Sequence, residues 1–185
     1  MLLQLKIQIK GISNPPVWRR ILVPGHFTFS RLHNVIQASF GWEDYHLYQF
    51  SPKGYGSEPQ IGEEDEWSEE DMENAEEVKI EKYLNQKGQK FTYIYDLGDD
   101  WIHTLTVEEI REEKAIRAEL LSGKGACPPE DCGGIWGYES LKETLADPKH
   151  EMHDEMLEWL GLEKGEDWDT LFFDMEYSKA TVATV

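Results

Sequence analysis

Strict alternation of apolar and polar residues opens the chain and limits what it can fold into. Residues 3 to 10 read LQLKIQIK, in which every second side chain is aliphatic. A period of two puts the aliphatic side chains on one face of a β-strand and the polar ones on the other, whereas a helix would scatter them. The chain therefore begins with a half-buried strand that needs a sheet to pair with.

Further segments extend this pattern. The turn sequence GISNPP leads into VWRRILV, and a Gly-Asp-Asp turn joins the alternating runs KFTYIYDL and WIHTLTVEEI. TFSRLHNVIQASFG has helical spacing, with Thr28 or Ser30 as N-cap and Gly41 as C-terminal residue. Strands are expected at 3–10, 17–23, 45–51, 90–97, 101–110 and 115–123, and helices at 28–41, 138–147 and 148–161. The order predicts an α+β fold that starts ββαβ, with a mainly antiparallel sheet of about five to six strands and about three helices.

Acidic residues dominate the charge of the chain, and they concentrate in one segment. The formal net charge is −19, and residues 52–77 hold eleven acidic residues but a single basic one, Lys53. We expect one domain over 1–185 in which 52–77 is a mobile, self-repelling insertion. An alternative is that this segment docks a basic protein, with Trp67 as anchor. The negative charge disfavours passive binding to nucleic acid or to anionic membranes.

The compartment is predicted from what the sequence lacks. No apolar run approaches the ~20 residues of a membrane span, and the opening residues do not have the pattern of a signal peptide. Cys127 and Cys132 are the only cysteines, too few for a secreted disulfide scaffold. A cytoplasmic protein is therefore expected.

The predicted hairpin turn is the first candidate site. Asp96, Asp99, Asp100 and His103 fall within eight residues. Clustered carboxylates bind hard cations, and a neighbouring histidine can serve as metal ligand or general base. The alternative is a purely structural turn, because aspartate and glycine are common turn residues.

Two later segments are further candidates. The glycine-rich loop GKGACPPEDCGGIWGYE carries Glu130 and Asp131, while its cysteine spacing does not match a zinc site. In HEMHDE, residues His150, His153 and Asp154 would share one helix face, which makes them a further candidate site for a divalent metal. A solvated polar face is the alternative there.

Four stretches carry a resemblance. NPPVWRRILVPG, LHNVIQASFGW, YIYDLGDDWIH and GACPPEDCGGIWGYE follow one another in a match that runs from about Ile7 to Tyr177. Together they resemble the plasmid pRiA4b ORF-3-like family, small proteins of plasmids, bacteria and archaea. The resemblance implies a compact α+β fold and no established activity.

The most specific of these motifs are the hairpin turn and the glycine-rich loop, and we expect them to meet in space. Arg19 or Arg20 would then neutralise part of the charge by a bidentate pair. The hypothesised pocket consists of Asp96, Asp99, Asp100, His103, Glu130 and Asp131, with Trp101 and Trp136 as walls.

The function expected from such a pocket is a non-catalytic binding or adaptor module. A metal-dependent hydrolase or nuclease that uses the Asp/His hairpin is the alternative. No cofactor is expected, although a divalent cation would suit the carboxylates.

Overall fold

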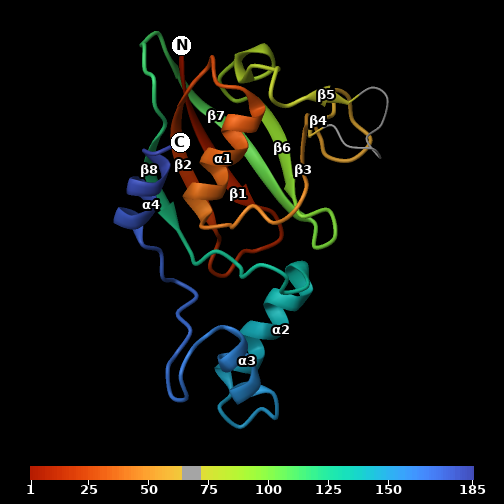
Figure 1. Cartoon of the computed structure of the whole chain (residues 1–185), viewed down its shortest axis with the longest axis vertical. Helices are drawn as coiled ribbons and strands as arrows, with labels where there is room; N and C mark the ends of the chain where they lie inside the picture. Colours follow the sequence, from red (N-terminus) through yellow and green to blue (C-terminus); the bar gives the residue numbers. More distant parts are fainter. Residues whose placement is uncertain (64–71) are drawn as a thin grey trace.

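A mostly antiparallel sheet forms the centre of the computed structural model, which describes residues 1–63 and 72–185 (Figure 1). Its strand order is β5-β4-β3-β6-β7-β1-β2-β8, and only the β4–β5 pair is parallel. The strands are β1 (Leu2–Ile9), β2 (Trp18–Pro24), β3 (Tyr48–Ser51), β4 (Ile61–Gly62), β5 (Glu73–Asn74), β6 (Lys90–Tyr95), β7 (Trp101–Arg111) and β8 (Glu119–Lys124). The predicted anchor Trp67 lies outside the described residues.

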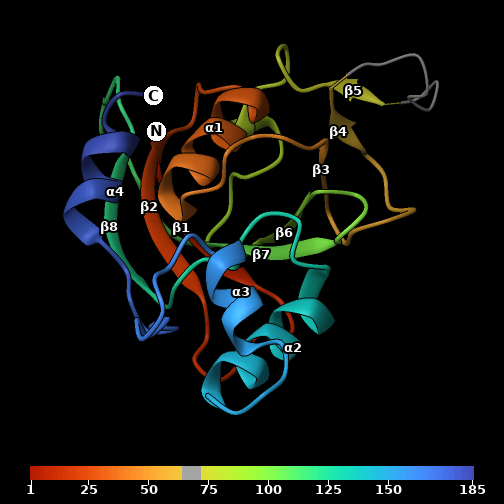
Figure 2. The ribbon, with the colours of Figure 1, turned by 60° about the horizontal axis from the view of Figure 1, so that its bottom comes forward.

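Helices cover one face and one end of this sheet. They are α1 (Phe29–Phe40), α2 (Gly134–Ala146), α3 (His153–Trp159) and α4 (Met175–Val182), with a short 3₁₀ turn η1 (Ile80–Lys82). Figures 1 and 2 show α1 and α4 on one face, and α2 and α3 beyond one end of the sheet. No helix among the described residues is both long and apolar enough to cross a membrane.

The α+β class and the ββαβ start agree with the sequence prediction, but the element numbers do not. Among the described residues the sheet has eight strands instead of five to six, because two-residue strands β4 and β5 extend its edge. Both lie within the acidic 52–77 segment, so part of that segment is paired. A fourth helix, α4, forms in the tail, where the Asp174 side chain accepts a hydrogen bond from the Tyr177 amide as N-cap.

The alternating strands bury the face that the sequence predicts. Leu5 and Ile7 of β1 are fully buried in one core with Leu32 and Ile36 of α1. Thr28 caps α1 by accepting from the Arg31 amide, and Gly41 ends it in the left-handed region at φ 92°. The intervening polar residues of β1 therefore point away from α1, to the opposite face of the sheet.

Candidate functional site

The turn between β6 and β7 fixes Asp96 at one end of the sheet. Its backbone is left-handed, with φ 54°, and its Oδ1 accepts from the amides of Gly98 (2.9 Å) and Asp99 (3.2 Å). The Asp100 amide donates to the Asp96 carbonyl at 2.7 Å and closes the turn. The two side-chain bonds use only Oδ1, and Oδ2 takes no part in the bonds of the turn.

The glycine-rich loop before α2 contacts this turn directly. The Gly133 amide donates to Asp99 Oδ2 at 3.0 Å. Gly134 has φ +63°, and a Cβ there would lie 2.4 Å from the Asp99 carbonyl oxygen. The structure thus brings together the two acidic loops, which the sequence predicted to meet, and a glycine is needed where they touch.

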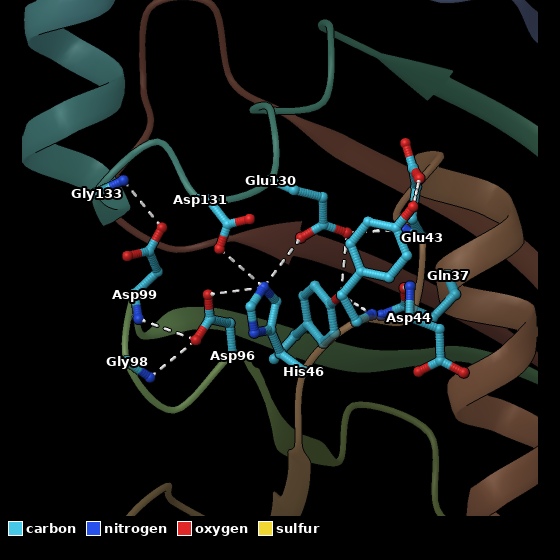
Figure 3. A network of polar contacts seen from close by, with 12 residues as sticks. Gln37, Glu43, Asp44, His46, Asp96, Gly98, Asp99, Glu130, Asp131 and Gly133 are labelled. Carbon is cyan, nitrogen blue, oxygen red and sulfur yellow. Dashed lines mark hydrogen bonds and ion pairs between the residues drawn. The ribbon is translucent and has the colours of Figure 1, made fainter.

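His46 lies between the carboxylates of both loops (Figure 3). Its Nε2 is 3.1 Å from Asp131 Oδ1, 3.6 Å from Asp96 Oδ2 and 4.0 Å from Glu130 Oε2. It comes from the segment before β3, and the Asp96 amide donates to the neighbouring Leu47 carbonyl at 3.0 Å. His46 is not among the site residues predicted from the sequence, because it lies inside a segment that reads as an aromatic-rich strand.

Glu130 is held at the inner wall of this group. Its Oε1 accepts from the Tyr95 hydroxyl at 3.0 Å and from the Glu43 amide at 2.8 Å. Burial raises the pKa of its carboxyl above the ordinary value, against the hydrogen bonds that favour the charged form. Among the described residues, buried Glu130 Oε2 has no hydrogen-bond partner, and buried His46 Nε2 contacts carboxylates only as ion pairs without hydrogen-bond geometry.

The geometry makes the pocket a candidate metal site. One ligand atom each from His46, Asp96 and Asp131 lies within 4.8 Å of the others, the one such group of three among the described residues. We call His46, Asp96, Glu130 and Asp131 the polar pocket. Asp96 is buried, whereas the Asp131 side chain is 67% exposed, so the pocket opens to solvent on the Asp131 side.

Other predicted residues lie around the pocket in structural roles. Asp99 holds the Gly133 amide, and Asp100 accepts from the Tyr55 hydroxyl. Trp101 is fully buried, with ring centroids 5.5 Å from Trp42 and 6.4 Å from Tyr138. Trp136 is 87% exposed on α2, which contradicts its expected place as a wall.

His103 does not reach the polar groups that it was expected to join. It is fully buried in the core, where its ring packs edge-on against Phe40 and its Nδ1 lies 2.7 Å from the Trp101 carbonyl oxygen. Burial lowers the pKa of the imidazole to about 4. The physical reason is the strand period: residues 101, 103 and 105 of β7 share the face that α1 covers.

The arginines do not neutralise the pocket either. Arg20 forms its bidentate pair with Glu108, through Nε at 2.6 Å and Nη2 at 2.9 Å. Arg19 is 1% exposed and binds backbone carbonyls instead of a carboxylate. Because β2 alternates, the two side chains point to opposite faces of the sheet.

The segment around His150 does not form the predicted helical face. The expected helix from residue 148 begins only at His153, because residues 147–150 form a turn in which the His150 amide donates to the Asp147 carbonyl at 2.9 Å. Asp154 pairs with Lys164 at 2.6 Å and lies 3.4 Å from His153. Cys127 and Cys132 are both free thiols.

Comparison with known proteins places this chain in a family. Residues 1–177 match the family described as plasmid pRiA4b ORF-3-like protein. The uncharacterized protein y4hQ of Sinorhizobium fredii is 41% identical over 164 residues, which cover 85% of this chain and 80% of that protein.

A solved structure shares the fold. The crystal structure of MM3350, a protein of unknown function from Methanosarcina mazei, superposes with a TM-score of 0.79 at 38% sequence identity and covers 95% of this chain and 96% of that one. Neither relative carries an assigned activity. With a family match over nearly its full length, the chain belongs to the plasmid pRiA4b ORF-3-like proteins.

Proposed function

We propose that the protein is a binding module whose polar pocket takes up one divalent metal ion. The observation that supports this most is the convergence of His46, Asp96 and Asp131, whose ligand atoms lie within 4.8 Å of one another. These residues come from three loops, and only the tertiary fold brings them together. An imidazole with two carboxylates is a common ligand set for divalent ions, and solvent access on the Asp131 side leaves room for water ligands.

The unsatisfied polar atoms of the pocket add to this support. Buried polar atoms are nearly always hydrogen-bonded, and the exceptions require an explanation such as a bound ion or water. Here Glu130 Oε2 lacks a hydrogen-bond partner, and 4.0 Å from it His46 Nε2 makes only ion-pair contacts, the shortest of them 3.1 Å to Asp131 Oδ1, without hydrogen-bond geometry. A cation between them would satisfy the histidine nitrogen and offset the three carboxylates at once.

The mixed ligand set indicates the class of metal. Oxygen ligands alone suit Mg²⁺ or Ca²⁺, whereas an imidazole nitrogen shifts preference toward Mn²⁺, Zn²⁺ and similar ions. We therefore expect tighter binding of Mn²⁺ and Zn²⁺ than of Mg²⁺.

Titration calorimetry with Mn²⁺ and Zn²⁺ on metal-stripped protein tests the site. The wild type should bind one ion, and His46→Asn should weaken that affinity by about 100-fold because a ligand is lost. His150→Asn is the matched control, since His150 lies outside the polar pocket, and its affinity should stay within about twofold of wild type. A wild type that binds neither ion, or an equal loss in both variants, would rule out the polar pocket as the metal site.

Metal-dependent hydrolysis is a second candidate, and Glu130 favours it. The buried Glu130 Oε2 has no hydrogen-bond partner among the described residues and faces the proposed metal position, where it would be placed to act as general base toward a metal-bound water. Bis(p-nitrophenyl) phosphate with Mn²⁺ is a simple phosphodiester substrate for a test. A hydrolase should lose activity by a factor of about 100 in Glu130→Gln when wild type and variant are compared at saturating Mn²⁺. If the Mn²⁺-loaded wild type shows no turnover, hydrolysis is ruled out and only the binding function remains.

A further inference from the structure

A second, chemically different groove lies on the sheet face that α1 does not cover. It has a volume of about 620 Å³ and lies over β1, β6 and β7, next to the turn that follows β1. Its lining residues are Lys6, Gln8, Ile9, Lys10, Gly11, Ile12, Ser13, Lys90, Thr104 and Thr106. We call this set the lysine groove. It shares no residue with the polar pocket.

Strand register explains why Lys6 and Lys90 face the same space, and Lys10 joins them from the turn after β1. Lys6 of β1 pairs with Thr106 of β7, and Thr106 pairs with Lys90 of β6, so the three form one row across neighbouring strands. Paired residues point to the same face, and each strand adds about 4.8 Å, so Lys6 and Lys90 flank Thr106 at roughly 10 Å from each other. Gln8 pairs with Thr104 in the next row and adds an amide and a hydroxyl.

The lysine groove is positive in a chain with a net charge of −19. Its lining contains three lysines and no carboxylate. Within the described part of the chain, none of the three makes an ion pair within 4.0 Å. Glu108 stands nearby on β7, but it is already bound by Arg20 at 2.6 Å and by the Gln4 amide at 2.8 Å. Lys6 also lies over the Trp18 ring, with its Nζ 5.4 Å from the ring centroid, a contact that does not cancel its charge. The three ammonium groups therefore keep positive charge that no close carboxylate in the described part of the chain offsets.

We propose that the lysine groove binds a small phosphorylated molecule of nucleotide size. Ammonium groups are strong donors to phosphate oxygens, and the threonine, serine and glutamine side chains supply further polar contacts. The volume of about 620 Å³ is in the range of small-ligand pockets.

The size of the ligand follows from the range of electrostatic forces. At physiological salt, charges separated by more than about 8 Å are largely screened. The electrostatic energy of a ligand bound among the lysines therefore depends mainly on those lysines and little on the acidic residues elsewhere on the surface. A long nucleic acid would extend beyond the lysine groove and meet the negative surface, which opposes binding. A compact anion avoids this repulsion.

Titration calorimetry with ATP, adenosine and pyrophosphate in EDTA tests the proposal without any metal at the polar pocket. The wild type should bind ATP and pyrophosphate, and its affinity for adenosine should be at least about tenfold weaker because phosphate carries the recognition. The triple variant Lys6→Gln, Lys10→Gln, Lys90→Gln should weaken ATP binding by about tenfold or more.

A control triple variant separates the lysine groove from general charge. Lys53→Gln, Lys114→Gln and Lys149→Gln remove the same charge at exposed positions outside the groove, and ATP affinity should stay within about twofold of wild type. Circular dichroism confirms that both variants are folded.

Three outcomes would overturn the proposal. The first is no binding of ATP or pyrophosphate at about 1 mM, and the second is an equal loss in the control triple variant. The third is tighter binding of an oligothymidylate of about 20 nucleotides than of ATP, which would identify the face as a nucleic-acid surface. Because EDTA removes metal, none of these results depends on whether the polar pocket binds an ion.

Discussion

At the scale of the residue, the neighbours Arg19 and Arg20 show how one step along a strand changes the role of a charge. Arg20 is half-buried and paired with Glu108, which raises the pKa of the guanidinium. Arg19 is 1% exposed, and burial lowers the pKa of its guanidinium to about 10. It donates to the carbonyls of Ser39 (2.8 Å), Lys124 (2.9 Å) and Gly125 (3.1 Å) and stacks on Phe173.

We predict that Arg19→Lys lowers the free energy of unfolding by about 3 kcal/mol, because one ammonium cannot replace the planar fork and leaves buried carbonyls without donors. Arg20→Lys, the matched substitution, should cost under about 1 kcal/mol at its solvent-accessible pair. Urea denaturation of both variants measures the difference. Equal losses of unfolding free energy in the two variants would show that the buried hydrogen bonds of Arg19 do not determine how much it stabilises the fold.

At the scale of the element, the joint between the β6–β7 turn and the loop before α2 decides whether the polar pocket exists. All four non-glycine residues with positive φ in the described ranges are aspartates, namely Asp44, Asp96, Asp100 and Asp131. Aspartate tolerates this region better than most residues, since its side chain can hydrogen-bond locally. Two of the four belong to the polar pocket, so loop conformation and ligand placement are linked.

We predict that Gly134→Ala lowers both stability and metal affinity, because its Cβ would force the Asp99 backbone away and separate the two loops. The expected stability loss is at least about 2 kcal/mol, from φ strain plus the displaced loop. Gly161→Ala is the control: its φ is +73° but nothing lies within 4 Å of an added Cβ. Gly161→Ala should lower the free energy of unfolding by about 1 kcal/mol, from backbone strain alone. Thermal unfolding and Mn²⁺ titration check both effects, and equal metal affinity in the two variants would contradict the prediction.

At the scale of the whole molecule, charge is unevenly divided. The net charge of −19 coexists with a lysine groove on one sheet face and with a neutral, buried His103 under α1. Net charge describes solubility and long-range forces, while binding depends on local charge. The prediction that passive nucleic-acid binding is disfavoured therefore concerns the surface as a whole, and it leaves room for a small anion in one groove.

Stability against acid should depend on His103. Its pKa is about 4 in the folded protein, below the value of about 6.5 for an unfolded chain, so the unfolded state binds more protons between these limits. The contribution of His103 to the free energy of unfolding is fully present above about pH 6.5. As the pH falls below this value, the free energy of unfolding decreases, by about 2 kcal/mol at pH 5 and about 3 kcal/mol at pH 4.

We predict that His103→Gln removes this part of the pH dependence, whereas His26→Gln, at an exposed position, leaves it unchanged. Urea denaturation at pH 7, 5 and 4 measures the effect as the difference between wild type and variant, which cancels the titration of the many carboxylates. Parallel pH profiles for wild type and His103→Gln would show that this buried histidine does not control acid stability.

The sequence alone determined the local features of this protein. Period two places Leu5 and Ile7 in the core, the capping residues set the ends of α1, and the turn chemistry of residues 98–100 makes the hairpin. Each depends on contacts close along the chain, which composition and spacing specify. The same alternation also put His103 on the buried face with Leu105, although the density of polar groups suggested otherwise.

Only the tertiary structure decided which distant residues share a site. His46 and Asp96 are fifty residues apart, and they meet because β3 pairs with β6 in the register Tyr48 to Tyr95. The lysine groove likewise requires that β6, β7 and β1 lie side by side. Sheet pairing between remote strands depends on the packing of the whole core, and no local pattern in a single sequence encodes that order.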